Sequence, residues 1–574
     1  MLFTAANARA LDAEAAASWG LDPFALVEAA GRRCARVLTA AFPHLFSASV
    51  SRQKAGAQAP HIVTLAGSGN NAADAMVLLR SLLLSGHAAA EPSALVINKV
   101  PADGEHTPRS EAFRSLQKMG VPVLVWGDVV RADVLQSRLE PADLIIDGIA
   151  GTGIEGPLRG TVAEMVIALN KLKKARYSAQ NSSPLLIVSI DVPSGNSDFW
   201  KPEMPIVEAD AALAIEPLKL CLFRPAARPY GGNILPVGEV FPPQLIAQFC
   251  GGRNLTTKDT KNTEGRDSLS FVSFAVDPPA AELIDWDHAR SRIPPVSKIA
   301  YKHERGVAEI RAGSPDAPGA ARIAARGAQA AGAGLVRLVV DPAIHPILAA
   351  NAGGIMAASI PANDEAGASR FSPDAILLGP GWGKTPDRES MLCQALEKEV
   401  AGIPLILDAD AILLAGDRVF HGNALLTPHP GELAAYTGIP KDEILTDPAP
   451  LLLALAEEKN AVFLFKSHVM YVVSPAGRLG IIDGMMPVLG MGGSGDLLAG
   501  FCAAIAARCR AGTTKNGGDF DLYSCAVAAA ALLIESAKTP ALASRFLDPL
   551  ELADRAADLA GEAWLPAKSK GLTI

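Results

Sequence analysis

The sequence predicts an α/β protein made of two domains, and three observations carry this prediction. Short apolar runs rich in branched residues alternate with helical segments, which is typical of strands joined by helical crossovers. This alternation occurs in two series, and a polar stretch over 251–270 separates them. The chain has 574 residues, of which 49% are hydrophobic, so it can form two large cores.

The first series contains four runs that we expect to be parallel strands buried on both faces, over 61–67, 122–126, 143–148 and 185–192. Helical segments are expected between them, over 74–85 and 161–172. This order of strand and helix favours right-handed crossovers and a three-layer α/β/α domain. We expect this domain to cover residues 1–245 and a linker to cover 246–279.

The second series predicts another α/β domain over residues 280–574. Its expected strands lie over 375–381, 404–410, 461–466 and 470–474. Alanine-rich helices are expected over 496–508 and 524–537. The two series share no obvious repeat.

The charge and cysteine content narrow the class of partner. Lysine and arginine number 52 against 60 acidic residues, which gives a formal net charge of −8. Because no basic stripe is visible, a small-molecule substrate is favoured and no nucleic-acid partner is expected. Seven cysteines without a CxxC pair predict free thiols in a reducing compartment. We find no secretion signal and no bilayer-length apolar run, so we expect a cytoplasmic protein with no membrane partner.

Polar residues and glycines follow three strands of the first series. The segment Gly67–Asp74 opens a helix, where exposed backbone N–H groups suit phosphate. Asp147 begins a glycine loop that runs to Pro157, and Asp191 begins a turn that ends at Gly195. Each feature alone is compatible with an ordinary capped turn. Three polar strand ends in one sheet nevertheless favour a shared ligand crevice.

The segment Gly490–Asp496 is the strongest feature of the second half. A glycine cluster runs directly into an apolar helix whose first turn contains Asp496. Backbone amides and the helix dipole at this place form an anion site suited to phosphate oxygens. Asp496 would then accept a proton from a hydroxyl that attacks phosphorus. The alternative is that Asp496 only caps the helix.

Three other segments of the second half place polar groups or glycines near strand ends. One is the glycine loop 379–383. In LDADA, Asp408 and Asp410 lie two apart on an expected strand, so they would share one face and orient substrate or metal, or cap a turn. In TPHPGE, His429 is held between two prolines and is expected to touch ligand, although a lone histidine is more often structural.

The first half resembles the NAD(P)H-hydrate epimerase family over residues 1–245. The resemblance rests on LVEAAG (26–31), GSGNNAAD, DGIAGTGIEGP, SIDVPSG and ADAALAIEPLKLCLF. It implies a Rossmann-like fold, with Asp191 as the acid/base residue and potassium held by Asn71, Asp147 and Ser194. It also implies that two loops bind substrate, through Asn70, Asn71, Ala72, Ala73, Asp74, Gly151, Thr152, Gly153, Ile154, Glu155, Gly156 and Pro157. The family usually has glycine at the positions of Ala72, Ala73 and Ala75.

The second half resembles the ribokinase-like superfamily over residues 280–570, and within it the ADP-dependent NAD(P)H-hydrate dehydratases. The resemblance rests on AGAGLVRLVV, LLGPGWG, LILDADA, LLTPHPGE, VFLFK and GMGGSGD. It implies that Asp496 is the catalytic base and that three residues contact the hydrate: Ala320, Gly383 and His429. It also implies a nucleotide site formed by Lys466, Ser467, His468, Val469, Met470 and Gly495.

Together the two resemblances predict a bifunctional repair enzyme that acts on NADHX and NADPHX. The first half would interconvert the R and S hydrates, and the second would dehydrate the S form with ADP as co-substrate. Potassium and magnesium are the expected ions, and a homo-oligomer is the expected assembly. Two alternatives stay open: a ribokinase-like kinase of a small alcohol, and a catalytically degenerate dinucleotide-binding protein.

Overall fold

The computed structural model describes residues 1–46, 59–126, 137–178, 185–250, 281–360, 372–516, 519–538 and 546–565. The chain divides into two compact units, Met1–Ala281 and Glu282–Ile574. The predicted domain boundary at residue 245 falls inside a helix, α8 (Pro243–Cys250). Most of the predicted linker, over 251–279, lies outside the described residues.

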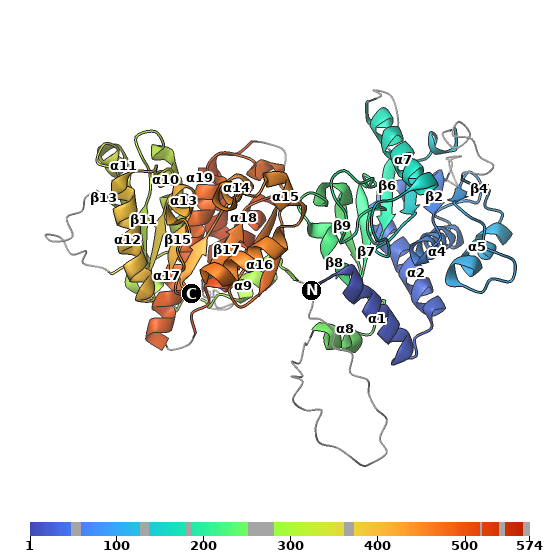
Figure 1. Ribbon diagram of the computed structural model, residues 1–574, viewed down its shortest axis with the longest axis horizontal. Helices are drawn as coiled ribbons and strands as arrows, with labels where there is room; N and C mark the ends of the chain where they lie inside the picture. Colours follow the sequence, from blue (N-terminus) through green and yellow to red (C-terminus); the bar gives the residue numbers. More distant parts are fainter. Residues whose placement is uncertain are drawn as a thin grey trace, which may run out of the picture. The chain divides into compact units, whose positions relative to one another are not determined.

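The first unit is built on a sheet of seven parallel strands in the order β4-β3-β2-β5-β6-β7-β9 (Figure 1). The strands are β2 (Ile62–Ala66), β3 (Ala94–Ile97), β4 (Val123–Val125), β5 (Leu144–Gly148), β6 (Leu186–Ile190), β7 (Ala211–Ile215) and β9 (Asn233–Val237). A short parallel pair, β1 (Leu2–Phe3) with β8 (Leu218–Lys219), forms a second sheet. All four strands expected in this half are present, each trimmed by one to three residues.

Helices cover both faces of this sheet, so the predicted three-layer architecture is confirmed. One apolar cluster joins the sheet to α2 (Pro23–Ala41), α4 (Asn70–Leu84) and α5 (Pro108–Lys118). A second cluster joins the opposite face to α7 (Gly160–Ser178). A smaller cluster packs α1 (Ala5–Ala17) against α8. Helix α4 begins four residues before the predicted start, because the chain already turns helical after Gly69.

The second unit contains a ten-stranded sheet in the order β10-β19-β18-β17-β16-β15-β14-β11-β12-β13. Its strands are β10 (Glu282–Leu283), β11 (Val307–Arg311), β12 (Leu335–Val340), β13 (Ile355–Ser359), β14 (Ala375–Leu378), β15 (Leu405–Leu407), β16 (Ala424–Leu426), β17 (Val462–Phe465), β18 (Val469–Val473) and β19 (Leu479–Asp483). Strands β11 to β17 are mutually parallel, whereas β18 runs antiparallel to both β17 and β19.

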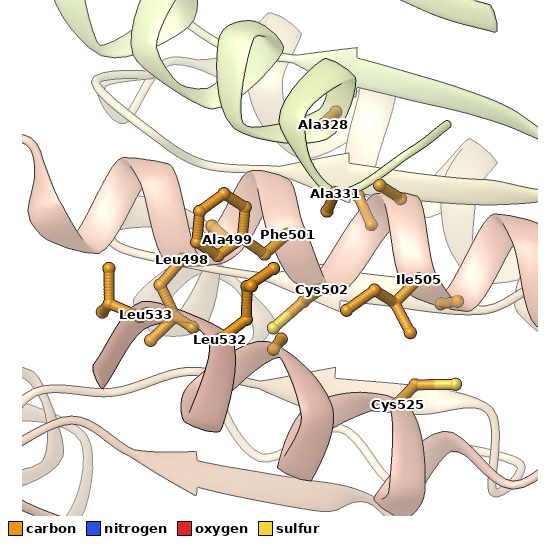
Figure 2. Close-up of a cluster of buried hydrophobic side chains, with 14 of the residues drawn as sticks. Ala328, Ala331, Leu498, Ala499, Phe501, Cys502, Ile505, Cys525, Leu532 and Leu533 are labelled. Atoms are coloured by element: carbon orange, nitrogen blue, oxygen red, sulfur yellow. The ribbon is translucent and has the colours of Figure 1, made fainter. Parts of the chain in front are cut away.

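The core of the second unit lies between one face of this sheet and four long helices: α10 (Pro318–Ala330), α17 (Ser494–Asn516), α18 (Leu522–Ala537) and α19 (Pro549–Trp564). Figure 2 shows α17 side chains such as Phe501 and Cys502 pointing into this cluster, with α18 and α10 on either side. The remaining helices are α9 (Trp286–Ser291), α11 (His345–Ala350), α12 (Pro386–Val400), α13 (Asp410–Ala415), α14 (Pro430–Thr437), α15 (Lys441–Thr446) and α16 (Pro448–Lys459).

Two glycines let α10 and α17 approach closely. A Cβ on Gly500 would lie 2.1 Å from the Ala324 carbonyl oxygen, and one on Gly327 would lie 2.6 Å from that of Leu497. Helix α10 follows β11, and Gly495 at the start of α17 lies near Lys466, which follows β17, so the N-termini of both helices come to the carboxyl ends of the strands. This is the end at which the ligand site of an open parallel sheet forms.

None of the helices in the described part of the chain has the length and apolar character of a membrane span. The six cysteines with described side chains form no disulfide, as the sequence predicts.

Candidate active sites at the strand ends

A cavity of about 660 Å³ opens at the carboxyl ends of β2, β5, β6 and β7 in the first unit. The three polar strand ends predicted from the sequence therefore meet. The predicted residues that line the cavity are Asn70, Asn71, Asp74, Gly151, Thr152, Gly153, Ile154 and Asp191. A cavity of this volume lies within the range of small-molecule sites.

Asp191 is held in an unusual backbone conformation next to a lysine. Its φ is 62°, in the left-handed region that non-glycine residues rarely adopt, and such conformations cluster at functional sites. The Lys219 ammonium lies 2.7 Å from Asp191 Oδ1 and also donates to the Ile215 carbonyl oxygen. Burial raises the pKa of the Asp191 carboxyl, while Lys219 acts in the opposite direction.

Asp147 and Ser194 form a buried polar cluster beside the cavity. Asp147 Oδ1 accepts from Ile149 N–H and from the Ser194 hydroxyl. Asp147 Oδ2 accepts from Ser189 Oγ at 2.7 Å and from Ser194 N–H at 2.9 Å. Asn71 donates through Nδ2 to the Ile190 carbonyl, and its Oδ1 faces Gly151. The three residues implied as potassium ligands thus gather at the ends of β5 and β6.

The alanines that stand where the family has glycine are compatible with the fold. Ala72, Ala73 and Ala75 lie in α4, are fully buried and have no positive φ. A helical residue needs no glycine, so these substitutions do not strain the loop. Because their side chains enter the core, any contact from Ala72 or Ala73 to a ligand would come from the backbone. Of the remaining loop residues, Glu155 and Pro157 are exposed and Gly156 has a φ of 92°.

Sequence reasoning missed four charged residues of this cavity, Arg9, Asp12, Glu216 and Lys219. Lys219 stands inside the apolar run LKLCLF and is 5% exposed, and a charged residue in such a run is a signal that could have identified it. Asp12 comes from α1, and no local pattern distinguishes it.

In the second unit, polar or glycine segments follow five neighbouring parallel strands. They stand after β11, β14, β15, β16 and β17, whose carboxyl ends share one edge of the sheet. These segments are Gly313–Ala320, Gly379–Gly383, Asp408–Asp410, Thr427–His429 and Lys466–His468.

Lys466 is the centre of an acidic cluster at this edge. Its ammonium forms an ion pair with Asp408 Oδ1 and lies 3.8 Å from Glu432 Oε2. Burial lowers the pKa of Lys466, but Asp408 and Glu432 more than offset this, so the net shift is upward. Thr427 Oγ1 donates to the same Asp408 oxygen at 2.6 Å. Lys466 therefore stays an ammonium ion at neutral pH.

Asp496 lies in the first turn of α17, and the charges of this cluster influence its pKa. Burial raises its pKa to about 6, Asp408 acts in the same direction, and Lys466 lowers it. A Cβ on Gly495 would lie 3.6 Å from Lys466 Nζ, so the lysine head is close to the start of the helix. A carboxyl with this pKa is a base at neutral pH.

The expectation that Asp408 and Asp410 share one strand face is wrong. Strand β15 ends at Leu407, Ala409 has a φ of 49°, and Asp410 begins α13. The reversal sends the two carboxylates to different partners. Asp408 is buried with Lys466, whereas Asp410 Oδ2 accepts from Gly383 N–H at 2.9 Å.

The glycine loop 379–383 lies against the N-terminus of α10. Gly381 has a φ of 57°, and a Cβ there would lie 2.8 Å from the Cβ atoms of Ala317 and Ala320. Gly383 has open space around its Cα. Ala320, in the first turn of α10, therefore lies beside the loop that contains Gly383; both residues are implied as contacts to the hydrate.

His429 acts as a helix cap. Its Nδ1 accepts from the N–H groups of Gly431 and Glu432, and Glu432 Oε2 accepts from His429 N–H. Because Nδ1 is an acceptor, the ring proton lies on Nε2, which is 3.4 Å from Glu432 Oε1. The exposed ring can still contact a ligand, but its visible role is to begin α14.

The predicted nucleotide segment turns between β17 and β18. Ser467 Oγ accepts from Val469 N–H, and His468 is exposed. Val469 and Met470 already belong to β18 and have buried side chains. Of this segment, Lys466, Ser467 and His468 are thus the residues whose side chains can reach a ligand.

Comparison with known proteins agrees with both halves. Residues 23–221 match a family model described as YjeF-related protein N-terminus, and residues 308–555 match one described as NAD(P)H-hydrate dehydratase. The bifunctional NAD(P)H-hydrate repair enzyme Nnr of Moorella thermoacetica is 28% identical over 527 residues, which cover 88% of each chain. Its counterpart in Salinibacter ruber is 27% identical, again with 88% of each chain covered.

Among solved structures, an ADP/ATP-dependent NAD(P)H-hydrate dehydratase from Bacillus subtilis is 24% identical, with a TM-score of 0.43. It covers 49% of this chain and 99% of its own. The two family models together match well over half of the present sequence, and the two curated relatives align with 88% of it. The chain therefore belongs to the family of bifunctional NAD(P)H-hydrate repair enzymes.

Proposed function

We propose that the first unit interconverts the R and S hydrates of NADH and NADPH, and that the second unit dehydrates the S hydrate with ADP. The observation that carries this proposal is a pair of strand-end sites, each with a carboxyl whose pKa is raised by burial and lowered by a lysine. These pairs are Asp191 with Lys219 and Asp496 with Lys466. Each site joins an acid/base group to a cation, as proton transfer and charge stabilisation require.

In the first unit, Asp191 would act at the carbon that carries the hydroxyl. A carboxylate there takes up the hydroxyl proton or offsets positive charge on the ring. Its location on the wall of the 660 Å³ cavity supports contact with the ring. The ion pair with Lys219 keeps the carboxylate form available despite burial.

The residues around Asp147 fit a potassium ion after one small rearrangement. All four lone-pair positions of the Asp147 carboxylate accept hydrogen bonds from the protein. The Ser194 hydroxyl, however, has a second acceptor, the Ala150 carbonyl oxygen at 3.1 Å. Rotation of this hydroxyl would free Asp147 Oδ1 to join Asn71 Oδ1 and Ser194 Oγ as oxygen ligands. Potassium would supply positive charge that helps to hold the anionic part of the substrate.

In the second unit, the N-terminus of α17 would receive the terminal phosphate of ADP. Backbone N–H groups at Gly495 and the helix dipole favour an anion there, and Lys466 adds a positive charge nearby. Asp496 would take the proton of the ring hydroxyl as its oxygen attacks phosphorus. Loss of the phosphate then restores the reduced nicotinamide.

Magnesium would be held mainly by the nucleotide and water. In the described ranges, no group of three histidine, cysteine or acidic side chains converges to form a protein cage. This suits magnesium, which keeps several waters and uses few carboxylates when it binds with phosphates. Asp408 and Glu432 are the carboxylates available to it, and the ion would neutralise charge on the phosphates.

The kinase and binding-only alternatives are less well supported. A kinase of a small alcohol would not need the first unit and its acid-lined cavity. The alanines in GNNAADA were the best support for a degenerate protein, and their helical placement removes that reason. The cytoplasmic location and the homo-oligomeric assembly stay predictions.

Incubation with mixed hydrate epimers tests the proposal. With ADP, we expect both epimers to be consumed and the absorbance of reduced nicotinamide to return fully. Without ADP, the epimer ratio should still relax but no reduced nicotinamide should form. A stable phosphorylated product would favour the kinase, and tight binding without turnover would favour the binding protein.

A further inference from the structure

Four acidic residues line the cavity of the first unit: Asp12 from α1, Asp74 from α4, Asp191 after β6 and Glu216 after β7. Glu216 accepts hydrogen bonds from the N–H groups of Val240 and Phe241, and among the described residues only Asp191 of the four forms an ion pair. The cations among the lining residues are Lys219 and Arg9. Lys219 is bound to Asp191, and Arg9 Nη1 is directed to the Thr152 carbonyl oxygen at 3.3 Å.

Asp74 has the least favourable environment for a negative charge. The residue is 7% exposed, and its Oδ1 is buried without a hydrogen-bond partner. Within the described part of the chain, Asp74 forms no ion pair. An isolated carboxylate in such a place is expensive, and the usual outcome is that the group keeps its proton.

Most of the titratable groups around Asp74 raise the pKa of its carboxyl. Burial raises the pKa of its carboxyl well above the ordinary value, and Asp191 and Asp12 raise it further, whereas Lys219 lowers it. On the α2 side the neighbour is Cys34, whose thiol pKa is raised by burial, so it stays neutral. The surroundings of Asp74 therefore favour a protonated carboxyl, whereas the ammonium of Lys219 favours the carboxylate form of Asp191 in the same cavity.

We propose that Asp74 is a second catalytic residue of the epimerase site, a general acid that works together with Asp191 as the base. This inference rests on the proposed function of the first unit. Asp74 lies one turn into α4, four residues after Asn70 and three after Asn71, so all three side chains occupy one helix face at the cavity. Two carboxyls whose environments separate their protonation states are a recurrent acid/base arrangement.

In this reaction each carboxyl gets back the proton that it gives, or returns the proton that it takes. Asp191 takes the proton of the hydroxyl on the hydrated carbon, the bond between this carbon and the ring nitrogen breaks, and its electron pair goes to the nitrogen. Asp74 gives its proton to that nitrogen. After rotation of the resulting aldehyde, the nitrogen attacks its other face and returns its proton to Asp74, while Asp191 returns a proton to the oxygen.

The variant Asp74→Asn tests this role, because the amide keeps the size of the side chain but cannot deliver the proton. We expect R-to-S conversion to fall by about 10²- to 10⁴-fold. In the intact protein, the rate should fall at alkaline pH as Asp74 loses its proton, and Asp74→Asn should lose this alkaline limb. Dehydration of supplied S hydrate with ADP should be unchanged. Glu164→Gln, which removes an exposed carboxyl of α7, is the matched control and should convert R to S normally.

Infrared difference spectra of the intact protein give a readout that needs no turnover. We expect a band of a protonated carboxyl at neutral pH that is absent from Asp74→Asn. Equal conversion rates in the two proteins, or an alkaline limb that persists in the variant, would overturn the inference. Absence of the band in the intact protein would overturn it as well. Failure of the intact protein to convert R to S would instead refute the proposed function.

Discussion

Lys219 Nζ lies 2.7 Å from Asp191 Oδ1, and both side chains are at most 10% exposed. The two residues come from different segments: Asp191 follows β6, and Lys219 ends β8. Burial raises the pKa of the Asp191 carboxyl, and the ammonium lowers it again, so Lys219 favours the form of Asp191 that can act as a base. The same lysine also donates to the Ile215 carbonyl, which anchors it to the end of β7.

Removal of the ammonium should therefore affect both stability and epimerisation. We expect Lys219→Met to lower the free energy of unfolding of the first unit by about 3–5 kcal/mol, because it leaves a buried carboxylate unpaired. The double variant Lys219→Met/Asp191→Asn should recover part of this loss. Denaturant unfolding of the single and double variants measures both effects. A single variant as stable as the unaltered chain would contradict the ion-pair argument.

Asp191→Asn separates the two activities. The variant should still dehydrate supplied S hydrate with ADP, since that reaction belongs to the second unit. It should leave the R hydrate unconsumed, because epimerisation lacks its base. Chromatography of the two epimers after incubation with ADP measures this division. Consumption of both epimers at the normal rate would show that Asp191 has no such role.

The proton-accepting role of Asp496 predicts a pH dependence of dehydration. Its pKa is raised to about 6, so the carboxylate form dominates above that pH and is lost below it. We expect the rate at saturating substrate to fall about tenfold for each pH unit below 6, and Asp496→Asn to abolish activity. Asp387→Asn is the control, because Asp387 is exposed in the first turn of another helix, α12. If Asp496→Asn keeps normal turnover, the assignment fails.

Asp74 makes a prediction on stability that is independent of catalysis. Its pKa is higher in the folded than in the unfolded protein, so the folded state keeps a proton that the unfolded state releases. By linkage, the free energy of unfolding falls as pH rises from about 4 towards the folded pKa. Asp74→Asn removes this cost, which is about 1.4 kcal/mol per unit of raised pKa. The variant should be more stable than the unaltered chain at pH 7 and similar to it near pH 4. The opposite ranking would mean that Asp74 is ionised.

The sequence predicts which residues stand at the carboxyl ends of the strands better than it predicts the ion pairs that form there. Strand ends and glycine loops are local signals, so the places of Asp191 and Asp496 could be expected. Lys219 lies 28 residues from its partner Asp191, and Lys466 lies 58 residues from its partner Asp408. Only the order of the strands in each sheet brings these partners together. The error at Asp408 and Asp410 has a similar origin. The apolar run gives no sign that β15 ends at Leu407, and the left-handed residue Ala409 separates the two carboxylates.

The glycine loop after β14 gives a matched pair of substitutions. Gly379 has a φ of 124°, and a Cβ there would lie 1.7 Å from the Asp408 carbonyl oxygen, which no rotamer change can relieve. Gly383 has a φ of 77° but open space around it, so alanine there meets only backbone strain. We expect Gly383→Ala to cost about 1–2 kcal/mol of unfolding free energy in the second unit. Gly379→Ala should cost more, because the clash adds about 1–3 kcal/mol, and it should reduce dehydration by displacing Asp408. Thermal unfolding and turnover measure both variants, and R-to-S conversion by the first unit, which should stay normal, is the internal control. Equal losses in the two variants would show that the loop adjusts to a side chain at Gly379, and that Asp408 does not depend on this close contact for its place beside Lys466.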